Sequence, residues 1–290
     1  MGLSRFDYYA PETIEEACRL ASELGEGEKF MAGGTDLLVK VKRKILNPKA
    51  VIDIKKIKEL DKISFDEKKG LTIGSTVTLD VVGNHSLIKE KYPAIADAAH
   101  ATANVQIRNM ASVSGNLCNA APSAENAPVL MAMGAHVTLV SSGGTRSVPL
   151  DEFFTGPGQT VIKNGEILTT IKVPIPPEGS GASYQHISAR SKVDISAVGV
   201  GAMLIMKDDI CESARIFLGA VAPTPIMAVN AQKVLTGNKL TEELLQTAGL
   251  EASKECKPIT DMRATAEYRT LMVAVLTGRA IDESLRRAAV

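Results

Sequence analysis

Two short glycine-centred segments, far apart in the chain, most limit how it can fold. The first, at 32–36, is Ala-Gly-Gly-Thr-Asp and lies between an apolar run and a helix-like stretch; the second, at 112–116, is Ser-Val-Ser-Gly-Asn. Adjacent glycines at a strand-to-helix turn let the backbone approach a ligand that any Cβ would exclude. The N–H groups of such a turn suit a pyrophosphate. The pair therefore predicts a diphosphate held from two sides.

Length and charge set the broad class of the protein. The chain has 290 residues, enough for two or three domains with their own cores, and 45% of its residues are hydrophobic. Its formal net charge is zero, so electrostatics gives no reason to expect a nucleic-acid or anionic membrane partner. We find neither an apolar stretch of membrane-spanning length nor a signal peptide, and we expect a cytoplasmic protein without a membrane span.

Cysteine and histidine spacing argues against a metal site. The four cysteines are scattered, without a Cys-x-x-Cys pair, which disfavours zinc or an iron–sulfur cluster in this chain. We expect Cys118, directly after the second glycine segment, to be a small buried thiol. His85, His100 and His136 have no ligand spacing, and we interpret them as structural or surface residues.

Periodicity and turn residues predict a mixed α+β chain. The predicted helices span 14–24, behind a capping box at Thr13, then 35–44, 93–102, 123–133 and 262–287. The predicted strands span 29–32, 51–54, 71–74, 136–140, 167–173, 183–188, 197–206 and 214–221, with a hairpin at 142–145. Strict βαβ alternation is missing, which favours α+β over a doubly wound sheet.

A dense cluster of proline and glycine at 174–181 interrupts the pattern and predicts a domain boundary. We therefore expect one domain over 1–177, divided into subdomains at about 1–55 and 56–177, and a second domain over 182–290. Helices dominate the second domain from Met227 onward.

The first glycine segment is ambiguous by itself. A tight turn without any ligand explains Gly33 and Gly34 more simply, and Thr35 and Asp36 can cap the following helix. A Gly-x-Gly-x-x-Gly motif is missing, so the sequence does not support a Rossmann dinucleotide site.

The second glycine segment is more specific because it lies in a dense cluster of small and polar residues. Gln-Ile-Arg-Asn precedes it at 106–109, and Asn-Ala-Ala-Pro follows at 119–122. These motifs, with the Ala-Gly-Gly-Thr-Asp-Leu stretch at 32–37 and the strand at 166–168, resemble the FAD-binding subunits of the molybdenum hydroxylases, the family of xanthine dehydrogenase and carbon monoxide dehydrogenase. The resemblance covers nearly the whole chain, including residues 190–198, which are similar to a segment that approaches the isoalloxazine.

This resemblance implies a PCMH-type FAD-binding domain made of two small α/β subdomains, followed by a C-terminal α+β domain of the CO dehydrogenase flavoprotein type. It implies non-covalent FAD, with the diphosphate and ribityl chain held by two runs of residues and the flavin approached by four single positions. The first run is Phe30, Met31, Ala32, Gly33, Gly34, Thr35, Asp36 and Leu37; the second is Ser112, Val113, Ser114, Gly115 and Asn116. The single positions are Thr102, Glu125, Leu168 and His186.

Three residues depart from the family pattern. Ser114 replaces a glycine, Glu125 replaces an aspartate, and His186 stands where lysine or arginine is common. A histidine would stabilise a reduced, anionic flavin less than a fixed cation would. The departures at 125 and 186 leave the contacts of those two residues open.

The function implied by the resemblance is that of an electron-transfer flavoprotein, an oxidoreductase subunit without a catalytic acid or base of its own. Electrons would come from [2Fe–2S] clusters on a small partner subunit, beside a large molybdopterin-binding subunit, in a dimer of heterotrimers, and would leave to an external acceptor. Two alternatives remain open: a stand-alone FAD oxidoreductase of the same fold, and a scaffold subunit that has lost flavin. The sequence does not name the substrate.

Overall fold

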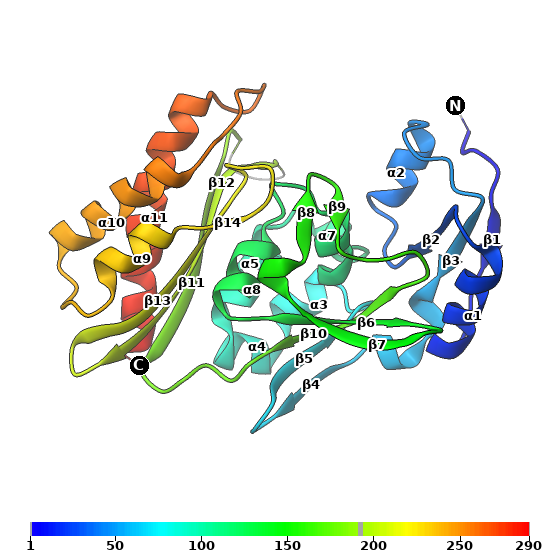
Figure 1. Cartoon of the computed structure of the whole chain (residues 1–290), viewed down its shortest axis with the longest axis horizontal. Helices are drawn as coiled ribbons and strands as arrows, with labels where there is room; N and C mark the ends of the chain where they lie inside the picture. Colours follow the sequence, from blue (N-terminus) through cyan, green and yellow to red (C-terminus); the bar gives the residue numbers. More distant parts are fainter. Residues whose placement is uncertain (1, 191–193, 290) are drawn as a thin grey trace.

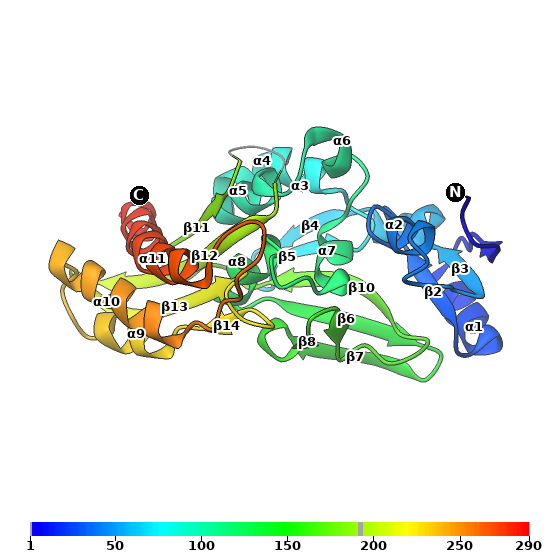
Figure 2. The same cartoon turned by 90° about the horizontal axis from the view of Figure 1, so that it is seen from above.

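The computed structural model describes residues 2–190 and 194–289 and has three sheets of three or more strands, arranged along its long axis. Figures 1 and 2 show the N-terminal sheet at one end, the C-terminal helices at the other and the remaining helices and strands between them. Residues 191–193, part of the segment that the resemblance brings near the flavin, lie outside the described residues. The α+β class predicted from the sequence is confirmed.

The N-terminal sheet is parallel, in the order β1 (Asp7–Tyr9), β3 (Ala50–Asp53) and β2 (Glu28–Met31). It carries the helices α1 (Ile14–Leu24) and α2 (Leu37–Lys42). The Thr13 side chain accepts a hydrogen bond from the Glu16 amide, so the predicted N-cap is confirmed. Two 3₁₀ turns, η1 (Ile54–Lys56) and η2 (Lys58–Leu60), lead into the second sheet.

The second sheet is antiparallel, and its five strands are β4 (Ile63–Asp66), β5 (Gly70–Gly74), β10 (Ile167–Val173), β6 (His136–Ser141) and β7 (Gly144–Pro149), in that spatial order. Its helices are α3 (Leu79–Asn84), α4 (Ser86–Lys91), α5 (Pro93–Ala101), α6 (Val105–Arg108), α7 (Val113–Asn119) and α8 (Asn126–Ala132). A 3₁₀ turn, η3 (Leu150–Glu152), and the short pair β8 (Phe154–Gly156) and β9 (Gln159–Thr160) complete this part.

The third sheet is also antiparallel and follows the Pro-Gly segment, with the strands β11 (Ser180–Ser188), β12 (Ser196–Lys207), β13 (Ile210–Gly219) and β14 (Ile226–Met227). One face is covered by α9 (Val229–Leu235), α10 (Glu242–Glu255) and α11 (Ala266–Ala288) (Figure 1). The other face packs against α5 and α8 of the preceding part. Helices therefore lie on both sides of this sheet.

Helix α8 lies at the centre of the molecule, and all seven of its residues are buried. A Cβ added to Gly201 on β12 would clash with the backbone of Pro128 and Val129, so β12 approaches α8 backbone to backbone. The Arg215 guanidinium donates to the Ala132 and Met131 carbonyl oxygens at 3.1 and 3.0 Å. These bonds satisfy carbonyls that the end of a buried helix would otherwise leave unpaired.

The structure corrects several sequence-based expectations. Residues 112–116 form the N-cap and first turn of α7, where Gly115 is helical, so they are not a glycine turn. The last helix begins at Ala266, four residues after the predicted start at Met262, because Thr265 caps it. The sequence analysis missed α3 and α4, which are too short to show a helical period.

We predict that Gly201→Ala destabilises the protein by about 1–3 kcal/mol, because a methyl group has no space against α8. The matched control is Gly278→Ala on α11, where the nearest atom to the new Cβ is the Leu245 carbonyl oxygen at 3.8 Å. This control should keep or slightly raise the stability, because alanine favours a helix over glycine. Thermal and urea unfolding measure both; equal midpoints for the two variants would contradict the close contact.

Candidate functional site

A cavity of about 1500 Å³ opens between the N-terminal sheet, the second sheet and the start of the third. It exceeds the roughly 300–1,000 Å³ of pockets for drug-sized ligands and has the room that an extended dinucleotide needs. Fifteen of the predicted site residues line it: Phe30, Met31, Ala32, Gly33, Gly34, Thr35, Asp36, Leu37, Thr102, Ser112, Ser114, Gly115, Asn116, Glu125 and Leu168. The predicted residues thus converge although they are far apart in sequence.

The first glycine segment forms one wall, where β2 ends and the chain turns into α2. Gly34 has a φ of +70°, a left-handed conformation that side chains disfavour. Gly33 is needed for another reason: its added Cβ would lie 1.9 Å from the Met110 carbonyl oxygen. The close approach that Gly33 permits is therefore between the two cavity walls, not between the backbone and a ligand.

The second wall begins with the N-cap of α7. The Ser112 hydroxyl accepts a hydrogen bond from the Gly115 amide at 3.0 Å. Gly115 is exposed to the cavity, and the nearest atom to its added Cβ is that same hydroxyl at 3.2 Å. A side chain at 115 would thus extend into the cavity. Val113, in the same turn, is fully buried in the core and lies outside the cavity lining.

Buried polar groups lie at this wall. The Ser114 hydroxyl is buried and has no hydrogen-bond partner among the residues that the structure describes. The Asn126 amide nitrogen donates to the Thr102 hydroxyl and to the Asn116 side-chain oxygen, both at 3.1 Å. The sequence analysis missed Asn126, a fully buried residue that fixes two predicted site residues. A buried hydroxyl without a partner is costly unless a ligand or water satisfies it.

Glu125 presents a buried carboxyl group to the cavity. It lies just before α8, and only 7% of its surface is exposed. The Ser196 hydroxyl donates to its Oε1 at 3.2 Å. The pKa of Glu125 is raised to about 7 by burial. Hydrogen bonds from Ser196 and from the backbone offset only part of this rise. This carboxyl therefore changes its protonation near neutral pH.

His186 lies outside the cavity lining, on β11, with its side chain at the surface. Its ring stacks on Tyr184 with a centroid separation of 5.7 Å, and its Nδ1 is 3.4 Å from the Ser196 hydroxyl. Desolvation by the surrounding protein lowers the pKa of His186 below its usual value. His186 is therefore mostly neutral at pH 7. Its link to the cavity is indirect, through hydrogen bonds to Ser196 and from Ser196 to Glu125.

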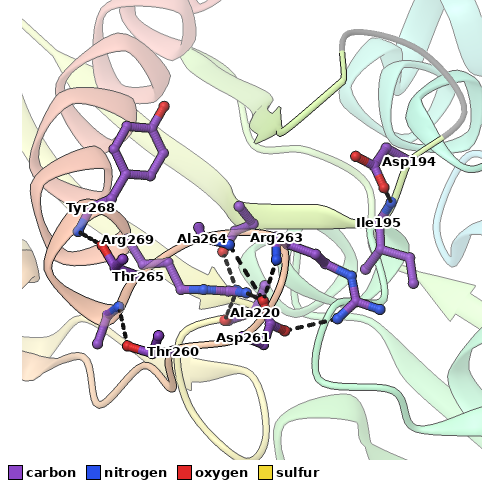
Figure 3. A network of polar contacts seen from close by, with 12 residues as sticks. Asp194, Ile195, Ala220, Thr260, Asp261, Arg263, Ala264, Thr265, Tyr268 and Arg269 are labelled. Atoms are coloured by element: carbon purple, nitrogen blue, oxygen red, sulfur yellow. Dashed lines mark hydrogen bonds and ion pairs between the residues drawn. The ribbon is translucent and has the colours of Figure 1, made fainter.

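The C-terminal part contributes a cation that the sequence analysis missed. Met262 and Arg263 line the cavity, in the loop before α11 that we predicted as helix. Asp261 pairs with Arg263 and with Arg269, each at 2.8 Å, and Figure 3 shows how the loop wraps around this carboxylate. The backbone N–H of Arg263 and the two guanidinium groups lower the pKa of Asp261 to about 2.

Arg269 anchors this loop to the third sheet. Its side chain is 4% exposed, and it donates to the carbonyl oxygens of Ala197 and Ala220 at 2.7 and 3.0 Å. Asp261 therefore links Arg263 at the cavity to the buried Arg269 through two ion pairs. The sequence does carry a signal for this loop: Asp261 and Arg263 form an Asp-x-Arg pair just before Thr265, the N-cap of α11.

Cys118 corrects a second expectation. Its side chain is exposed and lines the cavity, whereas we predicted a buried thiol. Desolvation by the surrounding protein raises the pKa of Cys118 above its usual value, so it remains a thiol.

The described residues contain no group of three or more His, Cys, Asp or Glu side chains that could hold a metal ion. In the same part of the chain, no helix is both long and apolar enough to cross a membrane.

These features fit the FAD that the sequence analysis expects. The cavity has room for a dinucleotide, Gly115 leaves open space in its wall, and the Ser114 hydroxyl there has no partner among the described residues.

Comparisons with known proteins agree with this assignment. Residues 4–176 match the family model described as the FAD binding domain in molybdopterin dehydrogenase, and residues 183–284 match that of the CO dehydrogenase flavoprotein C-terminal domain. The carbon monoxide dehydrogenase medium chain of Hydrogenophaga pseudoflava is 32% identical, over 98% of this chain and 99% of its own length. The xanthine dehydrogenase FAD-binding subunit of Escherichia coli O157:H7 is 30% identical, over 97% and 96%.

A solved structure of carbon monoxide dehydrogenase from Hydrogenophaga pseudoflava, lacking the Mo-pyranopterin moiety of its cofactor, superposes with a TM-score of 0.95, at 30% identity and over 99% of both chains. The two family models together match most of the chain, and the relatives and the solved structure each match nearly all of it. The chain belongs to the family of FAD-binding subunits of the molybdopterin dehydrogenases.

Proposed function

We propose that this chain is the electron-relay subunit of a molybdenum hydroxylase complex. FAD in the cavity would accept electrons from [2Fe–2S] clusters of a small partner subunit and pass them to an external acceptor. The large partner would carry the molybdopterin and oxidise the substrate. The observation that carries the proposal is the match over 98% of the chain to a protein whose name identifies it as the medium chain of a carbon monoxide dehydrogenase.

The cavity suggests a role for each wall. We assign the diphosphate and ribityl chain to the segments 30–37 and 112–116, and the flavin end to Thr102, Glu125 and Leu168. The isoalloxazine supplies the redox chemistry, and the protein binds and orients it. Arg263, held by Asp261, adds a positive charge to the wall of the cavity near the start of β12.

Two alternatives compete with this proposal. A stand-alone FAD oxidoreductase would need no partners, and a scaffold subunit would bind no flavin. The Ser114 hydroxyl has no partner among residues 2–190 and 194–289, and the wall is open at Gly115. Both features favour a chain that binds a ligand over an empty scaffold. A visible absorption spectrum of the purified chain tests the scaffold alternative directly. We further propose a cytoplasmic location.

The first prediction from this proposal is that the resident cofactor is FAD and not FMN, because the cavity accommodates a dinucleotide. Heat release followed by chromatography identifies the cofactor. Recovery of FMN, or of folded protein without flavin, would count against it.

The second prediction concerns Gly34→Val. A β-branched residue is strained at a φ of +70°, so the first wall should shift and FAD affinity should fall at least tenfold while the fold remains. The control is Gly237→Val, which imposes similar strain at a φ of +82° in a turn outside the cavity lining. FAD titration by fluorescence quenching measures both. Equal FAD affinity in the two variants would refute the assigned wall.

The third prediction concerns assembly. Isolated from its source without a tag, the chain should co-purify with an iron–sulfur subunit and a larger molybdopterin subunit, as a dimer of heterotrimers. Native mass spectrometry gives the stoichiometry. A stable monomer without partners would favour the stand-alone oxidoreductase.

A further inference from the structure

Three polar side chains form a continuous line from the cavity wall to the molecular surface. Glu125 faces the cavity, Ser196 is 3% exposed, and His186 is at the surface. The Ser196 hydroxyl donates to Glu125 Oε1 at 3.2 Å, and His186 Nδ1 lies 3.4 Å from the same hydroxyl. In the tautomer that carries the proton on Nδ1, both hydrogen bonds point inward, toward the cavity.

A β-bulge brings the serine into this line. Ile187 pairs with Val198, but the next residue, Ser188, pairs with Ser196, so Ala197 is an extra residue in β12. Side chains alternate between the two faces of a strand, and without the bulge Ser196 would point to the opposite face. The bulge turns its hydroxyl to the face that carries His186.

Tyr184 supports the outer end of the line. Its ring stacks on the imidazole of His186, with an interplanar angle of 10°. A Cβ added to Gly199, the register partner of His186, would lie 2.8 Å from the Tyr184 hydroxyl, so glycine leaves space for this stacked pair. Packing against Tyr184 thus favours this orientation of the imidazole.

We propose that His186, Ser196 and Glu125 form a proton relay that delivers protons from solvent to the flavin end of the cavity. The inference rests on the proposed function, because reduction of FAD to FADH₂ takes up two electrons and two protons. The electrons come from a reductant, which is the iron–sulfur partner in the complex. The protons come from water.

Each transfer along the relay conserves protons. Water gives a proton to His186 Nε2, and Nδ1 releases one to the Ser196 hydroxyl. That hydroxyl passes its own proton to Glu125 Oε1, and the carboxyl group gives one up toward the cavity. Rotation or tautomer exchange of the imidazole restores the starting state.

The groups around the relay let it work near neutral pH. Tyr184 faces Glu125 from β11, and burial together with the Glu125 charge raises the pKa of this phenol well above 10.0, so it stays protonated. Two carboxylates near the cavity have cationic partners: Asp194 pairs with Arg190 at 3.5 Å, and Asp261 pairs with Arg263 and Arg269, each at 2.8 Å. With a pKa of about 7, Glu125 is protonated below that pH and can donate; above it, the carboxyl is increasingly ionised, and proton delivery should slow.

A purely structural role is the competing explanation, because Glu125 and Ser196 also join the two parts of the molecule. A structural contact affects stability and FAD occupancy. A relay affects how fast a proton arrives once electrons have been supplied. The two are separated by measuring proton uptake in variants that still fold and bind FAD.

The experiment uses the full chain loaded with FAD. A light pulse with an external photoreductant supplies electrons, and the absorbance change that follows reports protonation of the reduced flavin. Glu125→Gln and Ser196→Ala should slow this phase by roughly 10²-fold at pH 7. The control is Ser188→Ala, which removes the hydroxyl of the register partner of Ser196, and this variant should match the wild type.

His186→Ala gives an independent readout, since the side chain is at the surface and its loss should not prevent folding. Added imidazole should restore the wild-type rate of flavin protonation in His186→Ala. It should not restore that rate in Ser196→Ala. Wild-type rates in Glu125→Gln and His186→Ala, both with full FAD occupancy, would overturn the relay and leave the proposed function intact. A wild-type chain that binds no FAD would overturn both.

Discussion

The packing of helix α8 holds the molecule together. All seven of its residues are buried, Pro128 contacts the backbone of β12 at Gly201, and Arg215 from β13 satisfies the carbonyls at its C-terminal end. A helix this short contributes little stability of its own, so the contacts of its two ends and its faces must hold it. Glu125 precedes its first turn and reaches Ser196 across the same interface. The packing that joins the two parts of the chain therefore also positions a carboxyl group of the cavity.

The cavity depends on a second close contact, between its own two walls. Gly33 approaches the Met110–Ala111 backbone so closely that no side chain fits, and this contact brings the first glycine segment beside the start of α7. Glycine thus shapes the site in three ways: Gly33 by wall-to-wall contact, Gly34 by a left-handed φ, and Gly115 by leaving open space. Only the last of these offers its space directly to a ligand.

The electrostatics of the site arise from burial more than from net charge. Desolvation raises the pKa of Glu125 to about 7. The N–H donors around Asp261 lower the pKa of that carboxyl group to about 2. Two carboxyl groups that line or support the same cavity therefore have opposite preferences at neutral pH. His186 provides no fixed cation, because desolvation lowers its pKa, whereas the guanidinium of Arg263 carries a permanent charge and lines the cavity.

Local signals in the sequence determined the α+β class, most of the longer helices and strands, the hairpin at 142–145 and the capping of the first helix by Thr13. The motifs also indicated the family and a set of residues of which most line one cavity. They could do so because turn geometry and the need for glycine depend on a few consecutive residues. The sequence alone could not show that 112–116 is a helix start, that Cys118 faces the cavity, or that Asp261 and Arg269 fix Arg263 there. Those features depend on contacts between residues far apart in the chain, such as Arg269 with Ala197, and on a bulge that decides which way Ser196 points. Only the packed structure determines them. Secondary-structure propensity depends on the local sequence, whereas burial and strand register depend on which distant residues pack against a segment.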